Sequence, residues 1–223
     1  MSKKNFDIYL DLGTSKIRAA GFEKNENNKI FSLENNCLTT LKSNQLNLSF
    51  TDKILEKTIL EIEKKTGEFL DNINLMLDCP GALSISLSVS KKNENFFLIR
   101  EDIEYLIQDA KQQILDAYQD KNIIHIIVNN YKINNIDHNS LPLNIKCNKF
   151  SIDIVFICFP SEIIDNLEKL FSKHQILIDN FICTSYAKSF TYQEHFTEFN
   201  QIAFLDIGYE KTSIVFYEQE KIK

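Results

Sequence analysis

Two segments of the sequence, 9–22 and 204–216, carry the same three-residue pattern, Asp-x-Gly, at the end of an apolar run. The residues of this pattern are Asp11 with Gly13 and Asp206 with Gly208. In each segment a short polar turn and a second apolar run follow, which predicts a β-hairpin. The tip of each hairpin therefore carries one carboxylate and several backbone N–H groups.

Hairpin tips of this composition are suited to binding phosphate. The hydroxyls of Thr14 and Ser15, together with backbone N–H groups, can surround phosphate oxygens. Each glycine lacks a Cβ atom, so the backbone at the tip can approach an anion closely. The carboxylates of Asp11 and Asp206 can hold a magnesium ion through its water shell. The sequence therefore predicts two hairpins that face each other and clamp the phosphates of a nucleotide.

An ordinary sheet turn is the alternative explanation of each hairpin, because a short motif alone has a high false-positive rate. Two copies, one near the start of the chain and one far downstream, favour phosphate binding over this alternative. A fold that keeps the hairpins without binding nucleotide stays open at this point.

Composition excludes several other classes of protein. With 223 residues, 43% of them hydrophobic, the chain can form one or two packed cores. Its net charge of -6 gives no basic surface, so we expect no nucleic-acid partner. No signal peptide and no run of about 20 apolar residues is present, which predicts a cytoplasmic protein. The five scattered cysteines and four isolated histidines have no metal-binding spacing, and we expect reduced, mostly buried thiols.

The apolar periodicity predicts a chain of mixed α/β structure. The first part should form strands at 5–12, 16–23, 29–33 and 46–50, a helix from Thr51 or Asp52 to about Gly67, and a strand at 73–77. The middle part, 83–160, should form a compact β-α-β-β insert with its helix beginning near Glu101. A helix from Ser161, a strand at 176–182 and a short helix at 184–192 precede the second hairpin.

This order of parts resembles the actin/Hsp70/sugar-kinase ATPase superfamily, in which one phosphate hairpin opens each half of the protein. The motif Asp11-Leu12-Gly13-Thr14-Ser15 resembles the first phosphate motif of that superfamily, and Asp206-Ile207-Gly208 resembles the start of the second. Arg18 stands where actin has a phosphate-contacting lysine. The resemblance implies an α/β, actin-like (ribonuclease H-like) ATPase fold that binds ATP and Mg²⁺. The predicted cofactor-binding residues are Asp11, Gly13, Thr14, Ser15, Lys16, Arg18, Asp206 and Gly208, with Asp11 and Asp206 holding magnesium through water.

Within the superfamily the insert resembles that of the FtsA family of bacterial cell division proteins, where it is called 1C and has an SHS2-type β-α-β-β fold. Residues 178–187 also resemble the FtsA segment before the second phosphate motif. The resemblance divides the chain into 1–82 (first part of subdomain 1A), 83–160 (1C), 161–200 (second part of 1A) and 201–223 (start of subdomain 2A). PilM, a pilus-assembly protein that shares the insert, is the alternative.

The resemblance implies an ATP-binding adaptor that links FtsZ filaments to the cytoplasmic membrane, self-associates into actin-like filaments and recruits later division proteins through 1C. Because the chain resembles about the first half of an FtsA, we expect membrane contact only through the missing C-terminal part. For the same reason the fragment alone should bind ATP weakly or not at all. A sugar or acetate kinase of the same fold is less favoured, since the sequence offers no strong catalytic group near the phosphates.

Two departures from the superfamily pattern affect the expected chemistry. The second phosphate motif usually continues Gly-Gly-Thr, and here Tyr209, Glu210 and Lys211 take those places. Side chains at this tip are expected to weaken or reshape that side of the clamp. Cys183 and Thr184 stand where related proteins carry a water-orienting Glu or Gln. We therefore expect slow ATP hydrolysis at most.

Overall fold

The structure is a computed structural model that describes residues 6–24, 28–36, 48–138, 140–141, 143–196, 198–209 and 211–223. The chain divides into two compact units, which are described separately. The first unit consists of Met1–Gly81, Ser161–Tyr192 and Phe204–Ile214, and the second of Ala82–Pro160, Gln193–Ala203 and Val215–Lys223. The assignment of named subdomains to these units stays a prediction.

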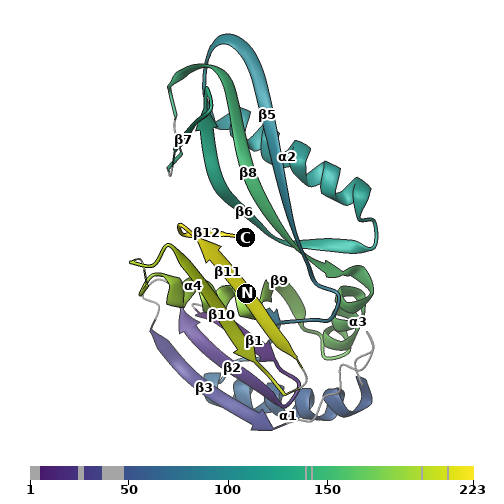
Figure 1. Ribbon diagram of the computed structural model, residues 1–223. Helices are drawn as coiled ribbons and strands as arrows, with labels where there is room; N and C mark the ends of the chain where they lie inside the picture. The colour runs from purple at the N-terminus through teal and green to yellow at the C-terminus, as the bar shows by residue number, and fades with distance from the viewer. Residues whose placement is uncertain are drawn as a thin grey trace. The chain divides into compact units, whose positions relative to one another are not determined.

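The first unit is built on a mixed five-stranded sheet with the order β3-β2-β1-β4-β9 (Figure 1). Its strands are β1 (Phe6–Leu12), β2 (Lys16–Glu23), β3 (Lys29–Asn36), β4 (Asn72–Leu77) and β9 (Leu177–Cys183). The first three strands form an antiparallel meander, whereas β4 pairs in parallel with both β1 and β9. Because β1, β4 and β9 run in the same direction, their carboxyl ends meet at one edge of the sheet.

Three helices complete the first unit: α1 (Leu48–Thr66), α3 (Ser161–Ser172) and α4 (Thr184–Gln193). Helices α1 and α3 bury apolar stripes with helical spacing. The buried members of these stripes are Leu55, Ile59, Ile62, Ile163, Ile164, Leu167, Leu170 and Phe171. The loop after α3 is tied to α1, because His174 Nε2 lies 2.7 Å from Asp52 Oδ1. Helix α4 follows β9 directly, so its first turn lies at the carboxyl edge of the sheet.

The second predicted hairpin is formed by β10 (Gln201–Ile207) and β11 (Thr212–Glu218). With β12 (Lys221–Ile222) these strands make a three-stranded sheet of order β10-β11-β12. The tip of this hairpin belongs to the first unit, which brings the second Asp-x-Gly pattern into the same unit as the first.

The second unit contains a four-stranded sheet with the order β5-β8-β6-β7, packed against one long helix (Figure 1). Its elements are β5 (Leu83–Phe97), α2 (Arg100–Ala117), β6 (Lys121–Ile133), β7 (Ile136–His138) and β8 (Lys146–Pro160). Helix α2 buries Ile103, Leu106, Ala110 and Ile114 at helical spacing, and β8 contributes Phe150 and Phe156, both fully buried. The predicted helical periodicity thus places these apolar residues in one core.

Several predicted elements have different bounds in the structure. The strand predicted at 46–50 is wrong over 48–50, which form the first turn of α1; residues 46 and 47 lie outside the described part. The helix continues toward the N-terminus past its predicted cap, because Leu48 and Phe50 extend its sequence without a helix-breaking residue. The turn-rich stretch 134–143 contains the short strand β7, which the two-residue turn at Asn134 and Asn135 pairs with the end of β6.

The cysteine prediction is confirmed where the structure describes it. Four cysteines, Cys79, Cys147, Cys158 and Cys183, are buried thiols that form no disulfide with one another, and Cys37 lies outside the described residues. Across the described residues, no helix has the length and apolar character needed to cross a membrane.

Candidate functional site

The tips of the two Asp-x-Gly hairpins close in the same way. The Gly13 N–H donates to the Lys16 carbonyl over 3.0 Å, and the Gly208 N–H donates to the Lys211 carbonyl over 2.8 Å. A Cβ atom at Gly13 would lie 2.9 Å from the Lys16 oxygen, and one at Gly208 would lie 3.0 Å from the Lys211 oxygen. A side chain at Gly13 would therefore force the backbone to shift, and one at Gly208 would be tightly packed against it. The shared pattern also extends to Asp-x-Gly-x-x-Lys, so Lys211 corresponds to Lys16.

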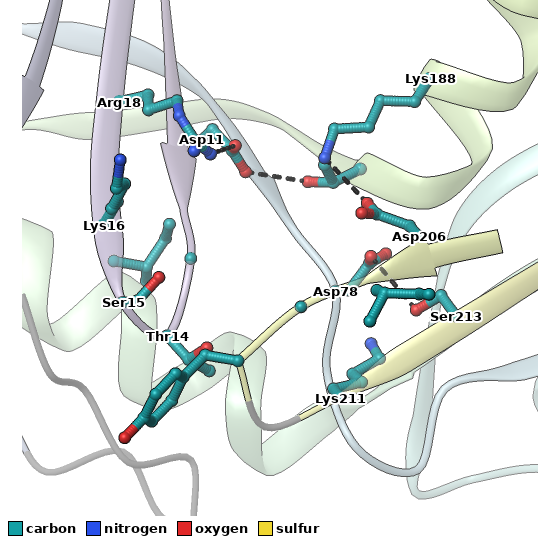
Figure 2. A pocket seen from close by; sticks show the side chains of 16 residues that line it. Asp11, Thr14, Ser15, Lys16, Arg18, Asp78, Lys188, Asp206, Lys211 and Ser213 are labelled. Atoms are coloured by element: carbon teal, nitrogen blue, oxygen red, sulfur yellow. Dashed lines mark hydrogen bonds and ion pairs between the residues drawn. The ribbon is translucent and has the colours of Figure 1, made fainter.

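The two tips line one cavity of about 270 Å³ within the first unit (Figure 2). All eight residues predicted to bind cofactor line this cavity: Asp11, Gly13, Thr14, Ser15, Lys16, Arg18, Asp206 and Gly208. Pockets that bury a whole small molecule usually measure about 300–1,000 Å³. The cavity is therefore large enough for the phosphates of a nucleotide but too small for the entire molecule.

Asp11 lies at the end of β1 and is held by groups from two other elements. Thr184 Oγ1, at the start of α4, donates to Asp11 Oδ1 over 3.2 Å, and an Arg18 guanidinium nitrogen lies 3.5 Å from Oδ2 (Figure 2). Burial raises the pKa of Asp11 above its ordinary value, although Lys188, Thr184 and Arg18 act in the opposite direction. The carboxylate is thus partly desolvated and surrounded by groups that favour its charged form.

Asp78, directly after β4, is a residue of the cavity that the sequence did not reveal. Its Oδ1 accepts hydrogen bonds from the Ser185 N–H (3.1 Å), Ser185 Oγ (2.9 Å) and Cys183 Sγ (3.3 Å). Its Oδ2 accepts one from Ser213 Oγ (3.4 Å) in the second hairpin. Burial, and after it the Asp78 charge, raises the pKa of the Cys183 thiol, so this group keeps its proton as a donor. Asp78 therefore caps α4 from a strand more than a hundred residues away in sequence.

Lys188 connects α4 to the second hairpin. Its Nζ donates to Asp206 Oδ2 over 2.8 Å, and both side chains are partly exposed to the cavity (Figure 2). Lys188 follows Thr184 by four residues and Ser185 by three, so all three lie on one face of the helix. One face of α4 thus contacts each of the three carboxylates of the cavity.

The remaining cations of the cavity are held in part by Glu34 on β3. Glu34 forms one ion pair with Lys16 and another with Arg18, whose Nε lies 2.9 Å from Glu34 Oε2. Both basic residues line the cavity, which also contains Lys188 and Lys211. Four cations lie against the three carboxylates Asp11, Asp78 and Asp206, and Glu34 beyond the lining brings the formal balance to zero. The cavity can therefore bind an anion through individual basic side chains rather than through a net positive charge.

The residues present fit a polyphosphate group. Two closed glycine turns, the hydroxyls of Thr14, Ser15 and Ser213, and four basic side chains converge on the cavity. They fit a metal ion less well, because Asp206 already binds Lys188 and Asp11 already contacts Arg18. Within the described ranges, no group of three or more His, Cys, Asp or Glu side chains is arranged to bind a metal.

None of the described residues lining the cavity is Glu, Gln or His, and the three carboxylates that could act on water, Asp11, Asp78 and Asp206, each accept a hydrogen bond from α4. At the predicted place for a water-orienting Glu or Gln, the Thr184 hydroxyl is bound to Asp11 and Cys183 is bound to Asp78. Slow hydrolysis of ATP therefore stays a prediction. The two residues at this position, Cys183 and Thr184, each bind a carboxylate of the cavity.

A comparison with curated proteins finds the cell division protein FtsA of Borreliella burgdorferi. It is 22% identical over 230 residues, a match that covers 96% of this chain and 52% of FtsA. The chain thus spans about half the length of this relative. No family model matches the chain.

Solved structures give the fold. A PilM–PilN type IV pilus biogenesis complex matches 97% of this chain and 59% of its own chain, with 12% identity and a TM-score of 0.59. A protein of Bacteroides thetaiotaomicron described as having an actin-like ATPase fold and unknown function covers 98% of this chain and 68% of its own, with 12% identity and a TM-score of 0.43. The chain is therefore FtsA-like in sequence, and it shares its fold with the matched chain of the PilM–PilN complex, in agreement with the fold class predicted from the two hairpins.

Proposed function

We propose that the chain forms the phosphate-binding part of an FtsA-like adaptor of bacterial cell division. In this proposal ATP is a switch for conformation and for self-association into actin-like filaments. The observation that carries the proposal is the pair of matched hairpin tips, both closed by a glycine turn around one cavity. An adaptor also fits a cavity whose three carboxylates, Asp11, Asp78 and Asp206, are each bound by a side chain of α4.

The partners and the location follow from the FtsA likeness. We expect the whole protein to link FtsZ filaments to the cytoplasmic membrane at the division site and to remain peripheral to that membrane. The β-α-β-β insert at 83–160 would be the 1C domain that contacts neighbouring subunits and later division proteins. Residues 1–82 and 161–200 would form subdomain 1A, and 201–223 the start of 2A.

Calorimetry of ATP binding in the presence of Mg²⁺ tests the proposal, with the full-length gene product and its Asp11→Ala variant. Asp11 contacts both Thr184 and Arg18, so its loss disturbs the first hairpin and the α4 contact together. We expect ATP binding to weaken by about 10-fold to 100-fold, the equivalent of one charge-assisted hydrogen bond. Asp165→Ala on the exposed face of α3 is the matched control and should bind as the wild type does. Absence of ATP binding by the wild type would refute the proposal.

A PilM-like adaptor that binds an extended peptide is the second candidate, and a specific cavity favours it. The first unit contains a second, mostly apolar cavity of about 970 Å³, whose lining includes Tyr9, Phe22, Leu33, Met76 and Ile182. Such a cavity could receive two or three apolar side chains of a peptide. Met76→Glu should then abolish binding of the peptide, and peptide binding that Met76→Glu leaves unchanged would count against this candidate.

A further inference from the structure

The Lys188 ammonium group lies where the carboxylates of the two hairpins come close to each other. It donates to Asp206 over 2.8 Å, and Figure 2 shows its side chain extending from α4 toward both Asp206 and Asp11. Its charge also acts on the partly buried Asp11 carboxylate. One lysine thus interacts with both residues that the sequence predicted as magnesium-holding carboxylates.

The surrounding structure determines the position of Lys188. The first turn of α4 is fixed by Thr184, which binds Asp11, and by Ser185, which binds Asp78. Both residues are buried, at 4% and 8% exposure, so the helix has little freedom to rotate. A side chain one turn later on the same face must project toward the cavity. Lys188 therefore reaches the second hairpin from a helix whose first turn is held in place.

Lys188 also keeps donors available for a ligand. An ammonium group has three N–H donors, and the bond to Asp206 uses one of them. A second cation, Lys211, makes a long contact of 3.5 Å to the Cys79 carbonyl, at the limit of a hydrogen bond. Both lysines line the cavity: Lys188 has two further N–H donors while it keeps its bond to Asp206, and Lys211 can turn toward an anion at the cost of one long contact.

We propose that Lys188 and Lys211 bind the phosphates of the nucleotide directly and replace the divalent metal, so that nucleotide binding in this pocket does not depend on magnesium. The inference rests on the proposed function, because it concerns the same nucleotide. Magnesium in proteins is commonly held by one or two carboxylates together with phosphate oxygens. Here Asp206 serves instead as the positioning partner of Lys188.

Calorimetry with ATP as the probe, in excess Mg²⁺ and in EDTA, tests the inference on the full-length protein. For the wild type we expect the two dissociation constants to agree within about threefold, because no metal contributes to binding. Lys188→Met removes the charge, keeps the length of the side chain and should weaken binding in EDTA by about 10-fold to 100-fold. Lys211→Met should weaken it in the same direction.

Two further variants keep the test interpretable. Lys188→Arg preserves the charge and should retain most of the metal-free binding. Lys169→Met, on the exposed face of α3, removes a surface lysine far from the cavity lining and should have no effect. Circular dichroism of each variant establishes that the fold is retained.

The outcomes separate this inference from the proposed function. A dissociation constant for ATP that rises by more than about tenfold in EDTA would overturn the inference and leave the proposed function standing. Unchanged metal-free binding by Lys188→Met, with the fold retained, would also overturn it. No ATP binding by the wild type under either condition would overturn both.

Discussion

Replacing Asp78 by alanine should destabilise the protein substantially, although this residue was not predicted as part of the site. The substitution removes the acceptor for the Ser185 N–H at the start of α4 and for the Ser185 hydroxyl. A lost helix cap costs about 1 kcal/mol, and a lost hydrogen bond to a charged group about 1.5 kcal/mol or more. The longer contacts from Cys183 and Ser213, at 3.3 and 3.4 Å, add little. We expect a loss of about 2–3 kcal/mol in the free energy of unfolding.

Urea unfolding followed by circular dichroism measures this loss, and a thermal scan should show a melting temperature lower by roughly 4–12 °C. Asp78→Asn keeps one oxygen as an acceptor for Ser185 and should lose less than half as much. Asp165→Ala, on the exposed face of α3, controls for the loss of a surface carboxylate. If Asp78→Ala unfolds within about 0.5 kcal/mol of the wild type, the cap assigned to Asp78 does not stabilise α4.

Three further predictions follow from other parts of the structure. Gly13→Ala and Gly208→Ala should each cost about 1–3 kcal/mol in urea unfolding, because the added Cβ would lie 2.9 or 3.0 Å from a backbone oxygen; a wild-type midpoint in both would contradict the tight-turn argument. Asp11→Asn should unfold at higher urea than the wild type at pH 7. Burial raises the folded-state pKa of Asp11, so its charged form costs stability above that pKa, and the advantage of Asn should shrink as the pH falls through it toward the ordinary Asp value; an advantage that grows toward low pH would show the opposite sign. Phe156→Ala removes a fully buried ring from the core of the second unit and should cost about 3–5 kcal/mol, measured in the same way; a loss below about 1 kcal/mol would mean that this core is loosely packed.

The hairpins could be predicted from sequence because their signals are local. An apolar strand, a glycine turn and a second apolar strand lie within fourteen residues of one another in 9–22. The structure confirms both hairpins and adds that Lys211 occupies the position corresponding to Lys16. The sequence alone suggested the reverse, since Lys211 was counted as a departure from the superfamily motif. The equal spacing of Lys16 and Lys211 from the two glycines is present in the sequence, and the carbonyls that close the two turns show what it does.

The residues that connect the hairpins could not be predicted, because their partners are distant in sequence. Asp78 looks like an ordinary polar residue before the Cys79-Pro80-Gly81 turn, and it meets Ser185 across 107 residues and Ser213 across 135. Lys188 looks like an exposed helix residue. Its contact with Asp206 depends on how the first turn of α4 is fixed against β1 and β4.

Local sequence patterns specify the elements that carry the chemistry: two carboxylate-bearing hairpins, their glycine turns and the α/β order that surrounds them. These features depend on backbone geometry and apolar periodicity, which act over a few residues. Which charges neutralise one another in the cavity depends instead on the three-dimensional packing of the chain. Three parallel strands end at one edge of a sheet, and the helix after the last of them places a threonine, a serine and a lysine against three carboxylates. Electrostatic pairing depends on distance in space, and the packing of the sheet and α4 sets that distance.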